Sequence, residues 1–276
     1  MAAIPNRVYE RLTSVLKRFQ PILNAAKSRD ASEADTSTIV KDILSEMFGY
    51  DRYGEITAEH MIKGTYCDLA IKLEGKVAPQ LLIEVKAIGI DLKEAHTKQA
   101  IDYAANQGVE WVILTNGATW RVYRVFFGQP ISQEVVFECD LLSLNPKNRA
   151  QVESLFLLAR EGQSKSVLHE YHAQRQAMSR HCLGALILDD VVLDVIRREL
   201  RRLSPDVKID REELRSVLVL EVLKRDLTEG EKAEEARRKV AKSQRRALRT
   251  RGKTEDEGAL VRADAAAASE DHPADL

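Results

Sequence analysis

The segment LLIEVKAI, residues 81–88, constrains the fold more than any other stretch of the chain. It is apolar and rich in strand-forming residues, as a buried β-strand should be, yet it contains Glu84 and Lys86. Side chains alternate between the two faces of a strand, so these two charged residues share one face. The opposite, apolar face is formed by Leu81, Ile83, Val85 and Ala87. The segment therefore predicts a core strand that holds a carboxylate and an ammonium group side by side.

The segments on either side of this strand predict an α/β domain built on a mixed sheet. Apolar residues at helical spacing predict a helix over residues 6–24, which Pro21 ends, and a second helix that Gly49 ends. A later helix is predicted over residues 91–107 and is closed by Gly108. The predicted strands cover residues 55–62, 66–73, 80–88, 110–115, 119–127 and 134–138. Helices and strands thus follow the order αβββαβ, with further strands after it, in a domain over residues 1–145.

The composition changes twice beyond this domain. The segment LNPKN marks a boundary, and residues 146–228 carry apolar clusters that predict a helical C-terminal region. Its amphipathic helices could bury against the α/β domain or form a homodimer. Residues 229–276 predict a solvated basic helix that frays into a disordered tail, because the last stretch has almost nothing to bury. The basic run from Arg237 to Lys253 could contact DNA phosphates, or simply form a solvated face.

A second carboxylate is expected beside Glu84. In the preceding strand, YCDLAIKL, Leu69 and Ile71 share a face, so Asp68 lies on the opposite one. If the two strands pair, Asp68 sits next to Glu84, and two neighbouring carboxylates repel unless positive charge lies between them. Oxygen ligands suit Mg²⁺ or Mn²⁺, and Lys86 could orient or help activate a water molecule there. The pattern predicts a metal site of the kind that hydrolyses phosphodiesters.

The helix after this strand carries a further signal. Gln99 and Tyr103 stand four residues apart, and therefore on one helical face. With Asp68 and the Glu84-Val85-Lys86 triplet, they resemble the PD-(D/E)xK nuclease superfamily, in the branch whose later helix carries Gln-x-x-x-Tyr. The segments LLIEVKAIG and KQAIDYAANQGVEWVILTNGATWRVY resemble, more narrowly, the N-terminal nuclease domain of the restriction subunit of type I restriction enzymes. This resemblance covers roughly residues 30–127.

The resemblance implies a restriction-endonuclease-like core and Mg²⁺-dependent cleavage of DNA. It implies Asp68, Glu84 and the main-chain carbonyl of Val85 as metal ligands, and Lys86 as the residue that serves the attacking water. Gln99 and Tyr103 would support the site and the phosphate backbone. The family also has an acidic residue on its first core helix; we assign it to Glu33, as a further candidate metal ligand, with Asp35 and Glu46 as alternatives. One departure is that Cys67 stands where the superfamily has proline before the aspartate.

Composition excludes several other classes. The net charge of −1 gives no overall field that would attract nucleic acid or a membrane. The N-terminal residues lack a signal peptide and no run is long and apolar enough to cross a bilayer, so we expect a cytoplasmic protein with no membrane contact. Three distant cysteines argue against a disulfide framework or a Cys-rich zinc site. His169 and His172, in HEYH, are one residue short of the zincin spacing, and we interpret them as surface histidines.

Together with the resemblance, these patterns predict a stand-alone, Mg²⁺-dependent DNA endonuclease or nuclease-like domain of restriction or mobile-element type. The Gly-Lys-Thr in RTRGKTED has Ala247 where a phosphate-binding loop needs its first glycine, so we expect neither ATP use nor the motor of type I restriction subunits. The alternative is a module that keeps the nuclease fold without catalysis and uses it for DNA binding or protein assembly.

Overall fold

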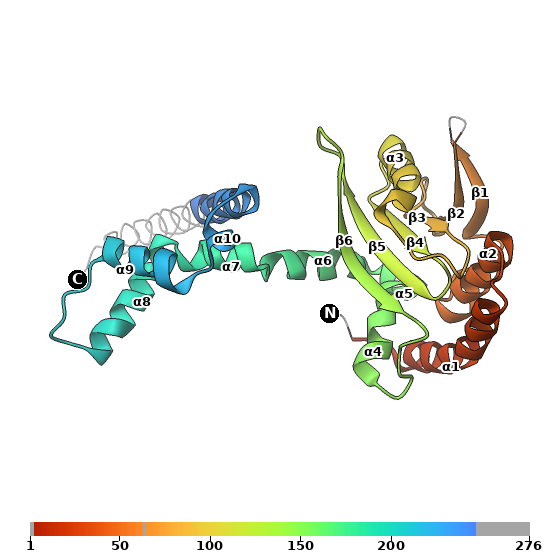
Figure 1. Ribbon diagram of the computed structural model, residues 1–276, viewed down its shortest axis with the longest axis horizontal. Helices are drawn as coiled ribbons and strands as arrows, with labels where there is room; N and C mark the ends of the chain where they lie inside the picture. Colours follow the sequence, from red (N-terminus) through yellow and green to blue (C-terminus); the bar gives the residue numbers. More distant parts are fainter. Residues whose placement is uncertain (1–2, 63–64, 247–276) are drawn as a thin grey trace, which may run out of the picture. The chain divides into compact units, whose positions relative to one another are not determined.

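The computed structural model describes residues 3–62 and 65–246 and divides into two compact units, Met1–His172 and Ala173–Leu276. Unit 1 carries a six-stranded mixed sheet in the strand order β1-β2-β3-β4-β5-β6 (Figure 1). Only β3 and β4 are parallel; every other neighbouring pair is antiparallel. The strands are β1 (Ile56–Ile62), β2 (Thr65–Ile71), β3 (Leu81–Val85), β4 (Trp111–Thr115), β5 (Thr119–Phe126) and β6 (Ser132–Asp140). The predicted α/β class and mixed sheet are confirmed.

One face of the sheet is covered by the N-terminal helices. Helix α1 (Asn6–Ser28) continues past Pro21, so the predicted end of this helix was wrong. Proline removes one backbone hydrogen bond and costs about 3 kcal/mol inside a helix. Leu23 and Ala26, both beyond Pro21, are buried in the core, and burying a leucine side chain gives back about 1.5–3 kcal/mol. Packing of the last turns therefore outweighs the local preference of proline.

The second helix, α2 (Glu33–Asp42), starts where its sequence provides a cap. The Ser32 side chain accepts a hydrogen bond from the Asp35 backbone N–H, and Glu33 adds negative charge at the positive end of the helix dipole. The helix continues as a π-turn, Ile43–Met47, and Gly49 ends it with a φ of +81°. Helix α2 packs on β3, which brings its first turn to the site described below.

The other face of the sheet is covered by a single helix of unit 1, α3 (Lys98–Gln107), which packs on β2, β3, β4 and β5 (Figure 1). It is preceded by a short 3₁₀ turn, Glu94–Thr97, so regular helix starts later than the predicted residue 91. Gly108 closes it in the left-handed conformation, as predicted. Strand β3 is buried along its whole length, on both faces. Glu84 shares the α3 face of this strand with Leu82 and is therefore largely shielded from water.

Unit 1 extends past residue 145, where the predicted α/β domain ended. Strand β6 is followed by four short helical segments: α4 (Arg149–Ser154), a 3₁₀ turn (Leu155–Leu157), α5 (Arg160–Ser164) and α6 (Val167–Ala177). Side chains from this stretch, including Val152, Phe156 and Leu168, belong to the same core cluster as α1 and α2. The predicted nuclease domain therefore shares its core with the first part of the predicted helical region.

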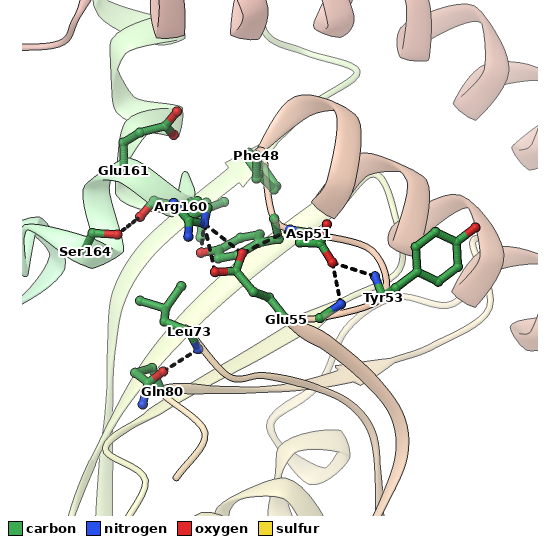
Figure 2. Close-up of polar contacts among 12 residues, drawn as sticks. Phe48, Asp51, Tyr53, Glu55, Leu73, Gln80, Arg160, Glu161 and Ser164 are labelled. Atoms are coloured by element: carbon green, nitrogen blue, oxygen red, sulfur yellow. Dashed lines mark hydrogen bonds and ion pairs between the residues drawn. The ribbon is translucent and has the colours of Figure 1, made fainter. Parts of the chain in front are cut away.

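An ion pair with a buried carboxylate joins this later stretch to the start of β1. Arg160 Nε lies 2.8 Å from both carboxylate oxygens of Glu55, which is 4% exposed (Figure 2). The Asp51 backbone N–H donates to the same carboxylate at 3.0 Å, and the Arg160 backbone N–H donates to the Phe48 carbonyl at 2.8 Å. These contacts hold α5 against the turn that follows α2.

Unit 2 is helical in its described part, as predicted for the C-terminal region. Its helices are α7 (Arg180–Ile187), α8 (Asp190–Leu203), α9 (Arg211–Val217) and α10 (Arg225–Thr228), with a further helix over residues 231–246. Ala236 and Val240 of the last helix are buried with Ala185, so this helix is solvated on one face only. The predicted disordered tail from residue 247 onward lies outside the described residues. Among the described residues, no helix has the length and hydropathy to span a membrane.

Candidate metal and catalytic site

Asp68 and Glu84 come together where β2 and β3 separate. The antiparallel pairing of these strands ends at Leu69 and Ile83, and the next pair in this register is Asp68 and Glu84. Here the ladder is continued by a side chain: the Val85 backbone N–H donates to Asp68 Oδ2 at 2.7 Å. The predicted pairing of these two strands is confirmed. Asp68 is half-buried and is fixed by the backbone of the strand that carries the second carboxylate.

Glu84 and Lys86 form a close ion pair on the α3 face of the sheet. Lys86 Nζ donates to Glu84 Oε1 at 2.6 Å, and the Glu84 residue is 5% exposed. The second carboxylate oxygen, Oε2, is buried and has no hydrogen-bond partner. A buried polar atom without a partner is costly, and it points to a group that the protein alone does not provide.

Burial dominates the electrostatics of this pair. It raises the pKa of Glu84, and the nearby carboxylates of Asp68 and Glu33 add to that effect, while Lys86 opposes it. Burial by itself would lower the pKa of Lys86, but the hydrogen bond and charge of Glu84 outweigh it and raise that pKa instead. The site therefore stabilises the charged form of Lys86 and disfavours the charged form of Glu84. A cation near Glu84 Oε2 would relieve the same burial cost.

Three acidic residues on α2 and its π-turn are candidates for the site: Glu33, Asp35 and Glu46. Of these, Glu33 reaches the site. Its Oε2 lies 3.8 Å from Lys86 Nζ, so the first turn of α2 contributes a third carboxylate near the pair. Asp35 is exposed. Glu46 pairs with Arg18 of α1 instead. Glu33 is itself exposed, so what separates it from Asp35 is its contact with Lys86; its role as the helix carboxylate stays a prediction.

The arrangement fits a small divalent cation bound by oxygen. One oxygen of each strand carboxylate is used to fix the geometry, Asp68 Oδ2 by Val85 and Glu84 Oε1 by Lys86. The other oxygen of each remains, and Glu84 Oε2 is already stripped of water. In the described part of the chain, no three His, Cys, Asp or Glu side chains form a ready ligand group. A cation here would need a main-chain oxygen or water in addition, which is common for Mg²⁺.

Gln99 and Tyr103 lie on α3, over the same face of the sheet. Tyr103 is 2% exposed and belongs to the apolar cluster beneath α3 with Cys67, Leu82 and Leu114. Burial raises its pKa to about 12, and the nearby Cys67 adds to the effect. Gln99 is exposed at the first turn of the helix. The hydroxyl of Tyr103 therefore stays protonated and can act as a hydrogen-bond donor.

Cys67, which stands where the resemblance would place a proline, is a buried packing residue. Its Sγ lies 3.3 Å from the Ile83 carbonyl and 3.5 Å from the Leu69 carbonyl. Burial raises the pKa of the thiol to about 12, and the charge of Glu84 adds to it. The thiol therefore carries no reactive thiolate at neutral pH.

Two buried polar residues next to the site were not predicted. Thr36 of α2 and Asn116, just after β4, both hydrogen-bond the backbone at Ile88, two residues beyond Lys86. The sequence holds one signal for this, an asparagine before Gly117 at the end of an apolar strand. Elsewhere in unit 1 lies a hollow of about 950 Å³ around Arg11, Glu55 and Arg160, and none of the predicted site residues lines it.

Comparison with known families supports the resemblance. Residues 40–135 match the family model described as type I restriction enzyme R protein N terminus. The predicted resemblance is therefore confirmed over this segment, which contains Asp68, Glu84, Lys86, Gln99 and Tyr103 but not Glu33. No curated protein and no solved structure matches the chain.

Proposed function

We propose that unit 1 is a divalent-metal-dependent DNA endonuclease of the PD-(D/E)xK type, with Mg²⁺ or Mn²⁺ as its cofactor. The observation that carries the proposal is Glu84, a buried carboxylate with one oxygen on Lys86 and the other without a partner, next to Asp68. The order of helices and strands around it, two helices, three strands, α3 and β4, supports the same assignment. The match to the restriction-subunit family supports DNA as the substrate.

Each residue has a role in this proposal. Asp68 and Glu84 hold the cation through the oxygens not used by Val85 and Lys86, with the Val85 carbonyl as a third ligand. The cation supplies positive charge that polarises the phosphate and makes a nearby water easier to deprotonate. Lys86, kept charged by Glu84, orients this water and stabilises the negative charge that develops on the phosphate. Glu33 lies close enough to Lys86 to orient it in turn.

The test is cleavage of supercoiled and linear DNA by the full chain in Mg²⁺ or Mn²⁺. We expect metal-dependent nicking that falls by about 10² or more in Lys86→Met, since the charge aimed at the reacting phosphate is lost. Glu84→Gln should abolish cleavage because it removes a metal ligand. The matched control is Lys76→Met, which changes an exposed lysine in the turn between β2 and β3 and should cleave like the natural protein.

Two results would contradict the proposal. One is cleavage that persists in Glu84→Gln, which would place the activity elsewhere. The other is a protein that binds DNA equally well with and without these substitutions and cleaves none, which would favour the non-catalytic binding module.

A further inference from the structure

We propose that Thr36 and Asn116 are positioning residues that clamp the backbone at Ile88 and so set the position of Lys86 relative to α2. Their side chains hydrogen-bond the backbone at Ile88, two residues beyond Lys86. Their contacts fix the end of β3 between the helix that carries Glu33 and the end of β4. The geometric part of this inference stands alone, and its catalytic consequence rests on the proposed nuclease function.

Asn116 continues the parallel ladder where β3 and β4 end. The last backbone bond of that ladder joins the Lys86 N–H to the Thr115 carbonyl at 2.8 Å. Beyond it, Asn116 Nδ2 donates to the carbonyls of Ile88 at 3.3 Å and Ile90 at 3.0 Å. Asn116 Oδ1 accepts from the Thr119 N–H at 2.8 Å, which orients the amide. The Asn116 side chain is 7% exposed. Its nitrogen bonds the segment after Lys86, and its oxygen bonds its own turn.

Thr36 holds the same residue from the opposite side. Its Oγ1 accepts from the Ile88 N–H at 3.1 Å and donates to the Ser32 carbonyl at 2.8 Å. Thr36 is fully buried in α2, one turn after Glu33. Ile88 therefore has its N–H tied to α2 and its carbonyl tied to the end of β4. Its side chain is buried as well, so the residue is fixed at three points.

Two glycines let neighbouring side chains approach the backbone beside the clamp. A Cβ on Gly89 would meet the side chain of Asp30, at the connection between α1 and α2. Gly117 has a φ of +83°, and a Cβ there would touch Leu23 and Thr36 at 3.4 Å. Two glycines thus let the segment after Lys86 and the turn after β4 come against the N-terminal helices.

The clamp acts on the contact between Lys86 and Glu33 of α2. Lys86 Nζ lies 3.8 Å from Glu33 Oε2, while Ile88, two residues further on, packs in the apolar core that α2 also contributes to. Apolar contacts are non-directional, so they do not set this distance. Two directed hydrogen bonds at Ile88, two residues from Lys86, do so. A misplacement of about 1 Å in an active site can cost about 10²-fold in rate.

Thr36→Val is the first test because valine keeps the shape and the branched Cβ. The matched control is Thr38→Val in the same helix: Thr38 Oγ1 also donates back one turn, to the Ala34 carbonyl at 3.1 Å, but Thr38 is exposed. We expect the Ile88 amide to exchange with solvent deuterium at least about tenfold faster in Thr36→Val than in the control. The NMR signals of the Lys86 side chain should shift in Thr36→Val only.

Asn116→Asp is the second test, because it replaces the amide donor by an oxygen that faces two carbonyls. Its control is Asn106→Asp, on the exposed face of α3, where Nδ2 donates to the Asp102 carbonyl at 2.9 Å. In the cleavage assay we expect kcat to fall by about tenfold or more in Thr36→Val and Asn116→Asp, with KM for DNA within about twofold. The thermal midpoints of the variants and their controls verify that all four proteins are folded.

The outcomes separate this inference from the proposed function. Unchanged Ile88 exchange in both test variants would overturn the clamp. Faster exchange with unchanged Lys86 signals and unchanged kcat would overturn the positioning role. If the natural protein cleaves no DNA, the proposed function fails, and the exchange and Lys86 signals still decide for or against positioning.

Discussion

Glu84 and Lys86 stabilise each other in a place where either charge alone would be costly. Glu84 is 7% and Lys86 21% exposed at the side chain, and their hydrogen bond is 2.6 Å long. A buried charge that loses its partner destabilises a protein far more than a missing neutral contact does. Strand alternation alone predicts that these side chains share a face. It cannot predict that α3 covers that face, because this depends on contacts between distant segments.

A double-mutant cycle should show this mutual dependence. We expect Glu84→Gln and Lys86→Met to be coupled by about 1–3 kcal/mol in the free energy of unfolding, because each single change leaves the other group buried and unpaired. Urea unfolding of the natural protein, both single variants and the double variant measures it. The exposed pair Arg149 and Glu153, 2.7 Å apart, is the control and should show much weaker coupling. Equal coupling at both pairs would mean that Glu84 is well solvated.

The cysteines should differ in reactivity according to their burial. The pKa of Cys67 is raised to about 12, and burial raises that of Cys139 as well. Cys182 is half-buried. We expect iodoacetamide at pH 8 to alkylate Cys182 in the folded protein and the other two only after unfolding. Mass spectrometry of peptides identifies the modified residue, and rapid labelling of Cys67 would mean that the strand ends near Asp68 open to solvent.

At the scale of elements, helix α6 is docked on the sheet by two histidines. Trp111 Nε1 donates to His169 Nε2 at 2.9 Å, and Arg124 Nη1 lies 3.0 Å from His172 Nδ1. The indole and guanidinium groups can only donate, so His169 Nε2 and His172 Nδ1 must accept. Each contact therefore needs that nitrogen to be unprotonated. His172 is buried, and Trp111 packs edge-to-face on His169 with ring centres 5.0 Å apart. The interpretation of these residues as surface histidines was therefore wrong for His172, because spacing along a helix does not tell which face meets the sheet.

Acid should loosen this docking. Burial lowers the pKa of His169, the nearby charges of Arg124 and His172 lower it further, and Glu110 opposes them. The unfolded chain therefore binds the proton more readily than the folded one. The stability that His169 contributes is full above its ordinary pKa, about 6.5, and is lost as the pH falls toward the lower folded value.

Urea unfolding between pH 7 and pH 5, followed by tryptophan fluorescence, measures the effect. Both tryptophans, Trp111 and Trp120, lie in unit 1. We expect His169→Gln to flatten the loss of stability over this range, whereas the control His181→Gln, in unit 2, leaves it unchanged. An unaltered slope in His169→Gln would show that this ring does not titrate with folding.

Elements were predictable where the pattern was local. Gly108 and Gly49 end their helices as predicted, since a left-handed residue at a helix end is a local requirement. The continuation of α1 past Pro21 was not predictable, because it depends on the burial of Leu23 against residues distant in the sequence. The clamp at Ile88 lies between these cases: the asparagine before Gly117 is visible in the sequence, but its acceptors follow a different strand.

At the scale of the whole molecule, the two units have very different cores. Unit 1 holds two large clusters of buried apolar residues, one on each face of its sheet. The cluster of unit 2, in its described part, consists of Ala185, Ala236 and Val240 with Cys182 packed against it. Stability follows the apolar area removed from water. Unit 1 should therefore fold without unit 2.

A fragment that ends at residue 177, the last residue of α6, tests this independence. We expect it to unfold cooperatively in urea, with a tryptophan fluorescence midpoint close to that of the full chain, because the fragment keeps every described member of both large clusters, together with Tyr171 that packs against the first. The same fragment should retain the metal-dependent cleavage. A fragment that is soluble but lacks a cooperative transition would mean that unit 2 contributes to the core of unit 1.

The proposed function depends on a divalent cation that binds between Asp68 and Glu84. Anomalous X-ray diffraction at the manganese edge, from crystals of the full chain soaked in Mn²⁺, would locate this cation. We predict a peak in contact with Asp68 and with Glu84 Oε2, which is absent from crystals of Glu84→Gln. Well-ordered crystals with no peak there at saturating Mn²⁺, and Glu84 still bound to Lys86 alone, would contradict the proposed function.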